Sequence, residues 1–183
     1  RGDLAYSNAI WHYARGIALA NKGDIKGARA EQAALMPLMA NEKVMKLDGS
    51  DYPASQLLSL ANNLLRGEIA MASGDTTSAV AEFTEAVSGQ DALPYTEPPC
   101  WYYPTRQSLG AALLTAGKAK DAEAVYRKDL EAYPHNGWST FGLIQALDAQ
   151  KKTADAAMHR EHFKAMWQFA DIELKGSRVS GSP

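Results

Sequence analysis

The chain has 183 residues, a formal net charge of −2 and a single cysteine. Its near-neutral charge gives no general attraction to nucleic acid or anionic lipid, and one cysteine excludes an intramolecular disulfide framework and a cysteine-rich zinc module. No run of 18 apolar residues occurs, so we expect no membrane span. The 32 alanines, against 11 valine and isoleucine residues together, favour packed α-helices over sheets.

The chain starts at Arg1, without a methionine and without a charged-then-apolar leader. We therefore expect a piece of a longer protein and assign it no compartment. The first three residues, Arg1-Gly2-Asp3, match an adhesion tripeptide, but so short a motif at one end of a chain supports no function.

A short pattern recurs along the chain: a glycine, a second glycine seven residues later and an alanine five residues after that. Such spacing predicts a helical hairpin. The first glycine allows close helix–helix approach, the second occupies a turn with positive φ, and the alanine begins the packing face of the return helix. The fourth copy keeps the spacing without glycines. The copies are Gly16, Gly23 and Ala28; Gly67, Gly74 and Ala79; Gly110, Gly117 and Ala122; and Ile144, Lys151 and Ala156.

The segment from Tyr103 to Asn136 resembles the tetratricopeptide repeat, a helical hairpin of about 34 residues. The resemblance implies an all-α solenoid of about four helical hairpins within residues 1–175. A second resemblance, over Pro94–Gly142, is to the C-terminal portion of long, poorly characterised bacterial tetratricopeptide proteins. The matching residues are Leu109, Gly110, Leu113, Gly117, Ala122, Tyr126 and Pro134, and the implied units are about 9–42, 60–93, 103–136 and 137–170.

Two insertions separate the units, at 43–59 and 88–104. Asp48-Gly49-Ser50-Asp51 reads as a break, after which we expect a helix from about Pro53 to Ser73. The last helix is predicted to be long, from about Thr153 to Lys175, and residues 176–183 to form a flexible tail.

In the family that this chain resembles, the first helices of the hairpins line a concave surface. On that face the helical spacing places mostly apolar and aromatic residues. Two interpretations stay open: a groove that binds an apolar peptide or helix, or a face covered by the chain's own insertions. The residues are Ile10, Tyr13, Ile17, Leu64, Glu68, Met71, Gln107, Ala111, Leu114, Trp138, Phe141 and Gln145.

Some members of the family hold the acidic C-termini of chaperones in a clamp of lysine, asparagine and arginine. The matching positions here are Tyr13, Ile17, Leu65, Pro104 and Ser108, which offer no cation. The resemblance therefore disfavours acidic chaperone tails as partners.

The segment from Leu93 to Pro104 holds four prolines and four aromatic residues. It is interpreted either as a docking surface, with Trp101, Tyr102 and Tyr103 as its candidates, or as a structural filler between two units. Arg106, which follows it, is a candidate for holding a carboxylate or phosphate, or else for capping the loop.

Candidate chemistry is sparse. His159 and His162 stand three residues apart and are weak candidates for a metal site, which needs more ligands than two. Cys100 with His135 as a base is the one nucleophile considered, and we expect no enzyme and no cofactor. A homodimer is expected if two or more of a set of apolar residues on the last helix are exposed. That set is Phe163, Met166, Trp167 and Phe169.

The predicted function is a non-catalytic protein-interaction scaffold with an apolar peptide or helix as its partner. The alternative is a structural role, as the C-terminal part of a longer repeat protein whose working site, metal binding being one option, lies in upstream repeats. A flat apolar surface on the helix that begins near Tyr6 would favour this alternative, because terminal repeats normally carry a polar outer face.

Overall fold

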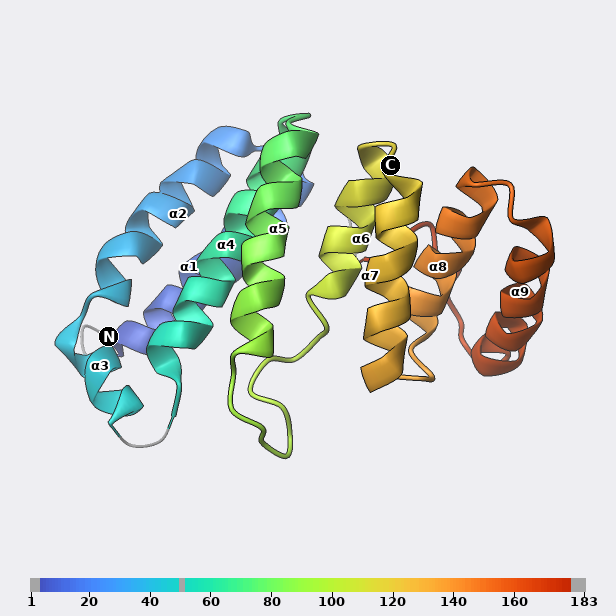
Figure 1. Ribbon diagram of the computed structural model, residues 1–183. Coiled ribbons are helices and arrows are strands. Elements are labelled where there is room, and N and C mark those ends of the chain that lie inside the picture. Colours follow the sequence, from blue (N-terminus) through green and yellow to red (C-terminus); the bar gives the residue numbers. More distant parts are fainter. Residues whose placement is uncertain (1–3, 50–51, 179–183) are drawn as a thin grey trace. The chain divides into compact units, whose positions relative to one another are not determined.

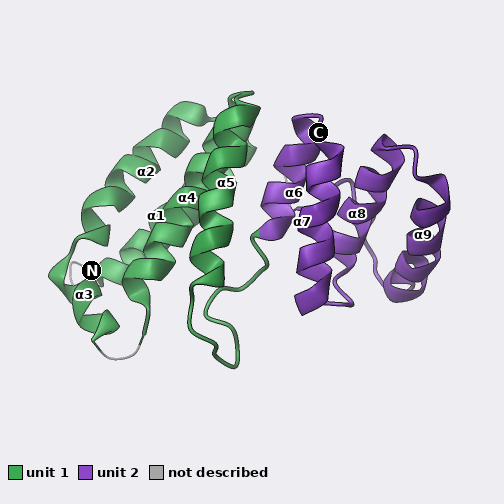
Figure 2. Ribbon diagram, viewed as in Figure 1, with its two compact units in different colours: residues 1–105 green, residues 106–183 purple. Residues whose placement is uncertain are grey.

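The computed structural model describes residues 4–49 and 52–178, and every regular element in these residues is an α-helix. The predicted all-α class is confirmed. The chain divides into two compact units, residues 1–105 and 106–183, where the sequence analysis expected one repeat domain over 1–175 (Figure 2). The helices are α1 (Ala5–Asn21), α2 (Ile25–Met39), α3 (Glu42–Asp48), α4 (Ala54–Ala72) and α5 (Thr76–Asp91) in unit 1, and α6 (Arg106–Thr115), α7 (Ala119–Ala132), α8 (Gly137–Ala149) and α9 (Thr153–Trp167) in unit 2.

Unit 1 is built around α4, which packs against α5 on one side and against α1 and α2 on the other (Figure 1). Most residues of α4 are buried, among them Leu57, Leu58, Leu64 and Leu65. A helix that is apolar on most of its circumference must be covered on most of its circumference, which explains why α4 is central. Its bounds agree closely with the predicted helix from 53 to 73.

Tight turns join α1 to α2 and α4 to α5. Gly23 and Gly74 hold φ at +80° and +77° in these turns, a conformation that residues with a side chain rarely adopt. The aspartate that follows each glycine caps the next helix: Asp24 accepts from the backbone N–H of Gly27, and Asp75 from that of Ser78. The predicted positions of these turns are confirmed.

The insertion at 43–59 contains a short helix, α3, that the sequence analysis did not anticipate. Asn41 caps its start by accepting a hydrogen bond from the backbone N–H of Lys43, and Val44 anchors it in the core with no exposed surface. Seven residues with one buried apolar position leave too weak a helical period to read from the sequence.

In unit 2, α8 lies between α7 and α9 and also contacts α6. Gly117 has φ +73° in the turn between α6 and α7. The turn between α8 and α9 uses Lys151 at φ +59° in the equivalent place, so the fourth copy of the pattern keeps the turn geometry without glycine.

The end of unit 2 differs from the prediction. Helix α9 stops at Trp167 and not near 175, and its 15 residues make it shorter than α4, with 19. The stop is stabilised by the indole N–H of Trp167, which donates to the carbonyl of Ile172 at 2.9 Å. The chain then passes behind α8 (Figure 1). Residues 168–178, called the C-terminal segment below, include a buried serine, Ser177, where a flexible tail was expected.

In the described part of the chain, no helix combines the length and the apolarity that a membrane span requires.

Candidate functional site

The aromatic loop of unit 1, residues 92–105, covers Tyr13 of α1. The ring of Trp101 lies 5.6 Å from that of Tyr13, and the hydroxyls of Tyr13 and Tyr102 are 3.2 Å apart. Tyr13 and Trp101 are only 4% and 6% exposed. The face of α1 that was predicted to line a groove is thus covered here by the chain's own insertion, which is the second of the two interpretations.

The side chain of Gln90 pins the base of this loop. Its amide N–H donates to the carbonyl of Tyr103 at 3.0 Å, and its amide oxygen accepts from both the backbone N–H and the hydroxyl of Thr105, each at 2.7 Å. Thr105 has no exposed surface. Sequence analysis missed Gln90, because nothing in the repeat pattern distinguishes it from other polar helix positions.

Tyr13 and three rings of the loop, those of Trp101, Tyr102 and Tyr103, form one cluster. Burial raises the pKa of Tyr13, and the neighbouring hydroxyls of Tyr103 and Tyr102 raise it further. Trp101 packs against Tyr102 and Tyr103, with ring centroids 5.1 and 6.3 Å away. The raised pKa keeps the Tyr13 hydroxyl uncharged at neutral pH, so the cluster contributes packing between the loop and α1.

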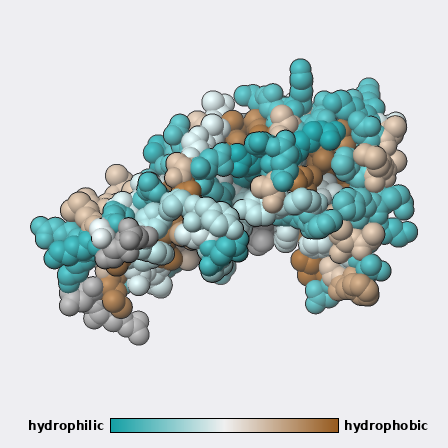
Figure 3. All heavy atoms as spheres, turned by 60° about the horizontal axis from the view of Figure 1, so that its bottom comes forward, coloured by the Kyte–Doolittle hydropathy of each residue, from teal (hydrophilic) through white to brown (hydrophobic). Residues whose placement is uncertain are grey.

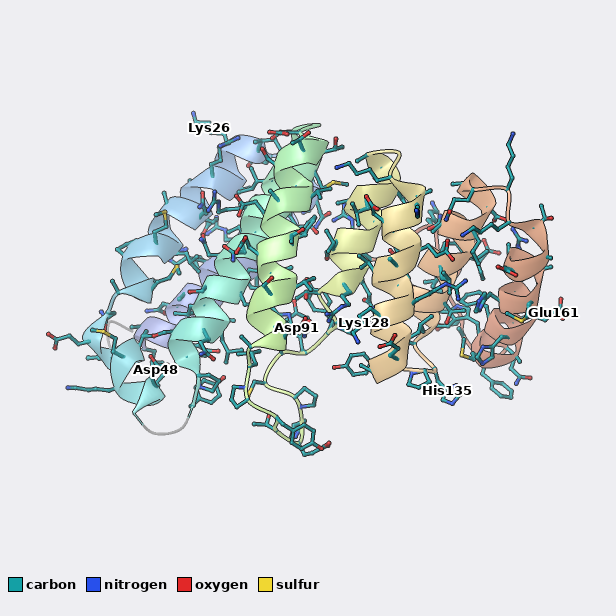
Figure 4. The ribbon with its side chains drawn as sticks, viewed as in Figure 1. Lys26, Asp48, Asp91, Lys128, His135 and Glu161 are labelled. Carbon is teal, nitrogen blue, oxygen red and sulfur yellow. The ribbon has the colours of Figure 1, made fainter. Side chains whose placement is uncertain are left out.

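Cys100 and His135, the nucleophile and base considered from the sequence, belong to unit 1 and unit 2 respectively. The thiol of Cys100 lies 3.2 Å from the hydroxyl of Thr96, within its own loop. His135 projects from the turn between α7 and α8 (Figure 4).

The other predicted groove residues of unit 1 lie mostly inward. Leu64 and Glu68 are buried on α4, and Ile10, Ile17 and Met71 are half-buried. None of this set is fully exposed, so these residues form part of the packing of unit 1.

In unit 2, the C-terminal segment lies against residues that were also predicted for the groove. Gln107 is buried, and its carbonyl accepts a hydrogen bond from the hydroxyl of Ser177 at 3.2 Å. The side chain of Gln145 donates to the carbonyl of Lys175 at 3.5 Å. Ala111 and Leu114 are half-buried.

Arg106, a candidate for anion binding, has a carboxylate of its own unit nearby. Its charge lowers the pKa of Asp129, although burial is the larger effect and raises that pKa overall. Asp129 is 1% exposed and accepts a hydrogen bond from the hydroxyl of Ser139. The arginine therefore stands beside an internal carboxylate of unit 2.

Aromatic side chains line a hollow between α8 and α9. The rings of Phe163 and Trp167 stack at 5.4 Å, and the ring of Phe141 lies 5.6 Å from that of Phe163. Trp138 meets Trp167 edge to face at 6.3 Å. The space, called the α8–α9 hollow below, has a volume of about 570 Å³; its lining residues are Phe141, Ile144, Arg160, Glu161, Phe163, Lys164, Trp167 and Gln168.

The rim of the hollow carries both charges. Arg160 is ion-paired with Asp148, and Lys164 and Glu161 complete the rim, Glu161 projecting from α9 (Figure 4). Apolar side chains interrupt an otherwise largely hydrophilic surface on the face seen in Figure 3. Of the predicted groove residues, Phe141 lines the hollow, and Trp138 contacts Trp167, which also lines it.

The four apolar residues expected on the last helix are not all on it. Phe163, Met166 and Trp167 are half-buried on α9, and Phe169, 91% exposed, follows its end. Since only one of the four is exposed, the stated condition for a dimer through this helix is not met.

The histidines of unit 2 lie near one another without forming a metal centre. His135 and His162 have ring centroids 6.0 Å apart, and burial followed by the charge of Arg127 lowers the pKa of His159. Within residues 4–49 and 52–178, no three of His, Cys, Asp and Glu lie close enough together to hold a metal ion.

Comparisons of the chain with protein-family models, with curated protein sequences and with solved structures give no match. The candidate sites therefore rest on the geometry of the described residues, in which the α8–α9 hollow is open and the aromatic loop of unit 1 is closed over Tyr13.

Proposed function

We propose that the chain is a non-catalytic protein-binding module of the tetratricopeptide type. Its repeat units would be the pairs α1–α2, α4–α5, α6–α7 and α8–α9. Support comes from the turns: Gly23, Gly74, Gly117 and Lys151 all have positive φ at the same place in the repeated pattern. Support also comes from close packing at the first glycine, since a Cβ added at Gly67 would lie 2.4 Å from the ring of Phe83.

The observation that carries the binding role is the α8–α9 hollow. It combines a stacked aromatic floor with an open mouth, whereas Tyr13, Leu64, Glu68 and Gln107 are buried. Apolar hollows with a polar rim are the usual seat of anchor side chains in protein interfaces. The proposed site is therefore one end of the predicted groove and not its whole length.

The chemistry of the lining indicates the partner. Phe141, Phe163 and Trp167 offer area to one aromatic or aliphatic anchor, and Lys164 at the rim suits a carboxylate beside that anchor. An amphipathic peptide with an apolar anchor and one adjacent acidic residue fits this pattern. Such a lining binds and orients a ligand, which is the basis for proposing a non-catalytic role.

A selection from a random-peptide display library tests this function. Peptides selected on the wild-type chain are expected to bind Phe163→Ser at least tenfold more weakly. Met158→Ser is the matched control, because Met158 is an apolar residue of the same helix that is 63% exposed and lies outside the hollow. Selected peptides that bind both variants equally would reject the site, provided that circular dichroism shows both to be folded.

A second candidate function, a structural part of a longer helical array, is favoured by exposed apolar residues at the first helix. Leu4, which precedes α1, and Trp11 of α1 are 60% and 53% exposed, and apolar residues exposed on a terminal helix suit a further helix pair. Hydrogen exchange tests this role: residues 5–21 should exchange more slowly within a longer parent polypeptide than in this chain. Equal exchange rates would argue against it.

A further inference from the structure

Tyr126 of α7 passes between two other helices of unit 2. A Cβ added at Gly110 of α6 or at Gly142 of α8 would lie 2.3 Å from the Cζ atom of this ring. Both positions must therefore lack a side chain for the ring to fit. The hydroxyl group of Tyr126 therefore lies on the side of α6 and α8 that the C-terminal segment covers.

The hydroxyl of Ser177 sits at the end of this ring. It lies 2.5 Å from the hydroxyl of Tyr126 and donates to the carbonyl of Gln107 at 3.2 Å. Because a serine hydroxyl has one hydrogen, Tyr126 donates and Ser177 accepts in the first of these bonds. The two bonds form a continuous chain from a tyrosine hydroxyl to a main-chain carbonyl.

The space around Ser177, called the seat below, has room only for a small side chain. Ser177 is 1% exposed, and a Cβ added at Gly142 would lie 2.7 Å from the Cβ of Ser177. A side chain larger than serine would have to displace the backbone of α8 or the ring of Tyr126. Leucine at this position would also leave the Tyr126 hydroxyl, which is buried, without its partner.

A backbone group of the segment that leads to Ser177 is bonded to α8. Gln145 of α8 donates to the carbonyl of Lys175 at 3.5 Å. The side chains of Ile172 and Lys175 are exposed. A main-chain hydrogen bond combined with one enclosed small side chain is a common way to bind an extended peptide ligand.

We propose that this seat on α6, α7 and α8 is a binding site for an extended peptide of a partner protein that presents a small hydroxylated side chain, and that residues 172–178 occupy it as the chain's own ligand. The site is distinct from the α8–α9 hollow and does not depend on it. Because the ligand is already tethered, a partner peptide gains access when the C-terminal segment leaves.

Cleavage of the folded chain tests the proposal. A protease recognition sequence is inserted between Ala170 and Asp171, both exposed, and the folded chain is then cut. The probe is a fluorescent synthetic peptide of residues 171–178, followed by anisotropy. We expect it to bind the cut chain at least tenfold more tightly than the uncut chain; retention of the cut segment through gel filtration is the same result in another form.

Two controls test the chemistry of the seat. A peptide carrying Ser177→Leu should bind the cut chain at least tenfold more weakly than the native peptide. The chain variant Tyr126→Phe, which keeps the ring and removes the hydroxyl, should weaken binding of the native peptide about tenfold. The experiment with the leucine peptide uses the cut chain without any substitution. It therefore remains valid if the Tyr126→Phe variant does not fold.

Three results would overturn the proposal: no binding of the native peptide to the folded, cut chain from which the cut segment has dissociated; equal binding of the native and leucine peptides; or a dimer in which two copies exchange their C-terminal segments, which would make a second copy the occupant. Circular dichroism of the cut chain establishes that it is folded before the peptide is added.

Discussion

The carboxylate of Glu123 on α7 accepts a hydrogen bond from the ammonium group of Lys152 at 2.6 Å, which ties α7 to the residue that directly precedes α9. The same carboxylate group accepts from Arg127 at 2.9 Å and from Gln150 at 2.7 Å. Glu123 is 8% exposed. These bonds, that with Lys152 first, lower the pKa of Glu123 to about 2.

Glu123→Gln is therefore expected to destabilise unit 2 in a pH-dependent way. A carboxyl group whose folded pKa is depressed contributes stability above its unfolded pKa and loses it as the pH falls toward the folded value. We expect a loss of about 1–2 kcal/mol at pH 7, since the cationic partners are partly exposed, and a smaller loss as the pH falls from about 4.5 toward 2. Urea unfolding at pH 7, 4 and 2.5 measures this difference.

Glu131→Gln is the matched control in the same helix. Glu131 pairs with Lys128, but both side chains are about two-thirds exposed, at 65% and 64%. Removing that pair is expected to change the free energy of unfolding by less than about 0.5 kcal/mol at any of these pH values. Equal losses in the free energy of unfolding for the two variants would show that the Glu123 network adds no more stability than an exposed ion pair.

Asp129→Asn should have the opposite pH dependence. Burial raises the pKa of Asp129, and the hydrogen bond from Ser139 and the charge of Arg106 offset this only in part. A group with a raised folded pKa adds stability at low pH and loses it as the pH rises through that pKa. The asparagine variant should therefore be more stable than wild type, by about 1 kcal/mol, at pH 7 and lose this advantage on acidification.

Urea unfolding of wild type and Asp129→Asn at pH 7 and pH 4 measures the effect, because the other carboxyl groups cancel in the comparison. Asp121→Asn, an exposed aspartate of the same helix, is the control and should change little at either pH. An asparagine variant that is less stable than wild type at pH 7, with no change at pH 4, would contradict the expectation.

Local chemistry explains which features of the fold could be predicted from the sequence. A positive φ requires glycine or a tolerant residue at the turn itself, so Gly23, Gly74 and Gly117 are visible without any tertiary information. The long apolar helix α4 is likewise predicted from one continuous run of residues, without tertiary information. Both predictions are confirmed by the described helices.

Features that depend on distant contacts were missed. Ser177 lies 70 residues from Gln107, and Tyr13 lies 89 residues from Tyr102. Neither partner carries a local pattern that indicates the other, so the tail was expected to be loose, and the sequence left open whether Tyr13 lines a groove or lies under the chain's own insertion. The aromatic partners of Trp138 and Phe141 lie on the adjacent helix α9. These two residues therefore lie nearer to an open space, the α8–α9 hollow, than Tyr13 does.

A side chain added at the first glycine of the repeated pattern should disturb the packing of the helices. In Gly110→Ala the new Cβ would lie 2.3 Å from the ring of Tyr126, which itself is fully buried, so α6 and α7 must move apart. We expect a loss of about 1–3 kcal/mol, measured by urea unfolding. Gly89→Ala is the control: its Cβ would meet only Leu60 at 4.0 Å, and the substitution should stabilise α5 by about 0.5–1 kcal/mol. Destabilisation of equal size in both variants would refute the packing argument.

Gln90→Ala should release the aromatic loop from unit 1. It leaves the buried backbone N–H and hydroxyl of Thr105 without their acceptor, at a cost of about 1–3 kcal/mol in the free energy of unfolding. The loop that covers Tyr13 would then open more often, because Gln90 also holds the carbonyl of Tyr103. Limited proteolysis within residues 92–105 should become several-fold faster, whereas Glu85→Ala, at an exposed position of the same helix, should leave the rate unchanged. If cleavage stays slow after Gln90→Ala, the contacts of Trp101 with Tyr13 alone are sufficient to hold the loop closed.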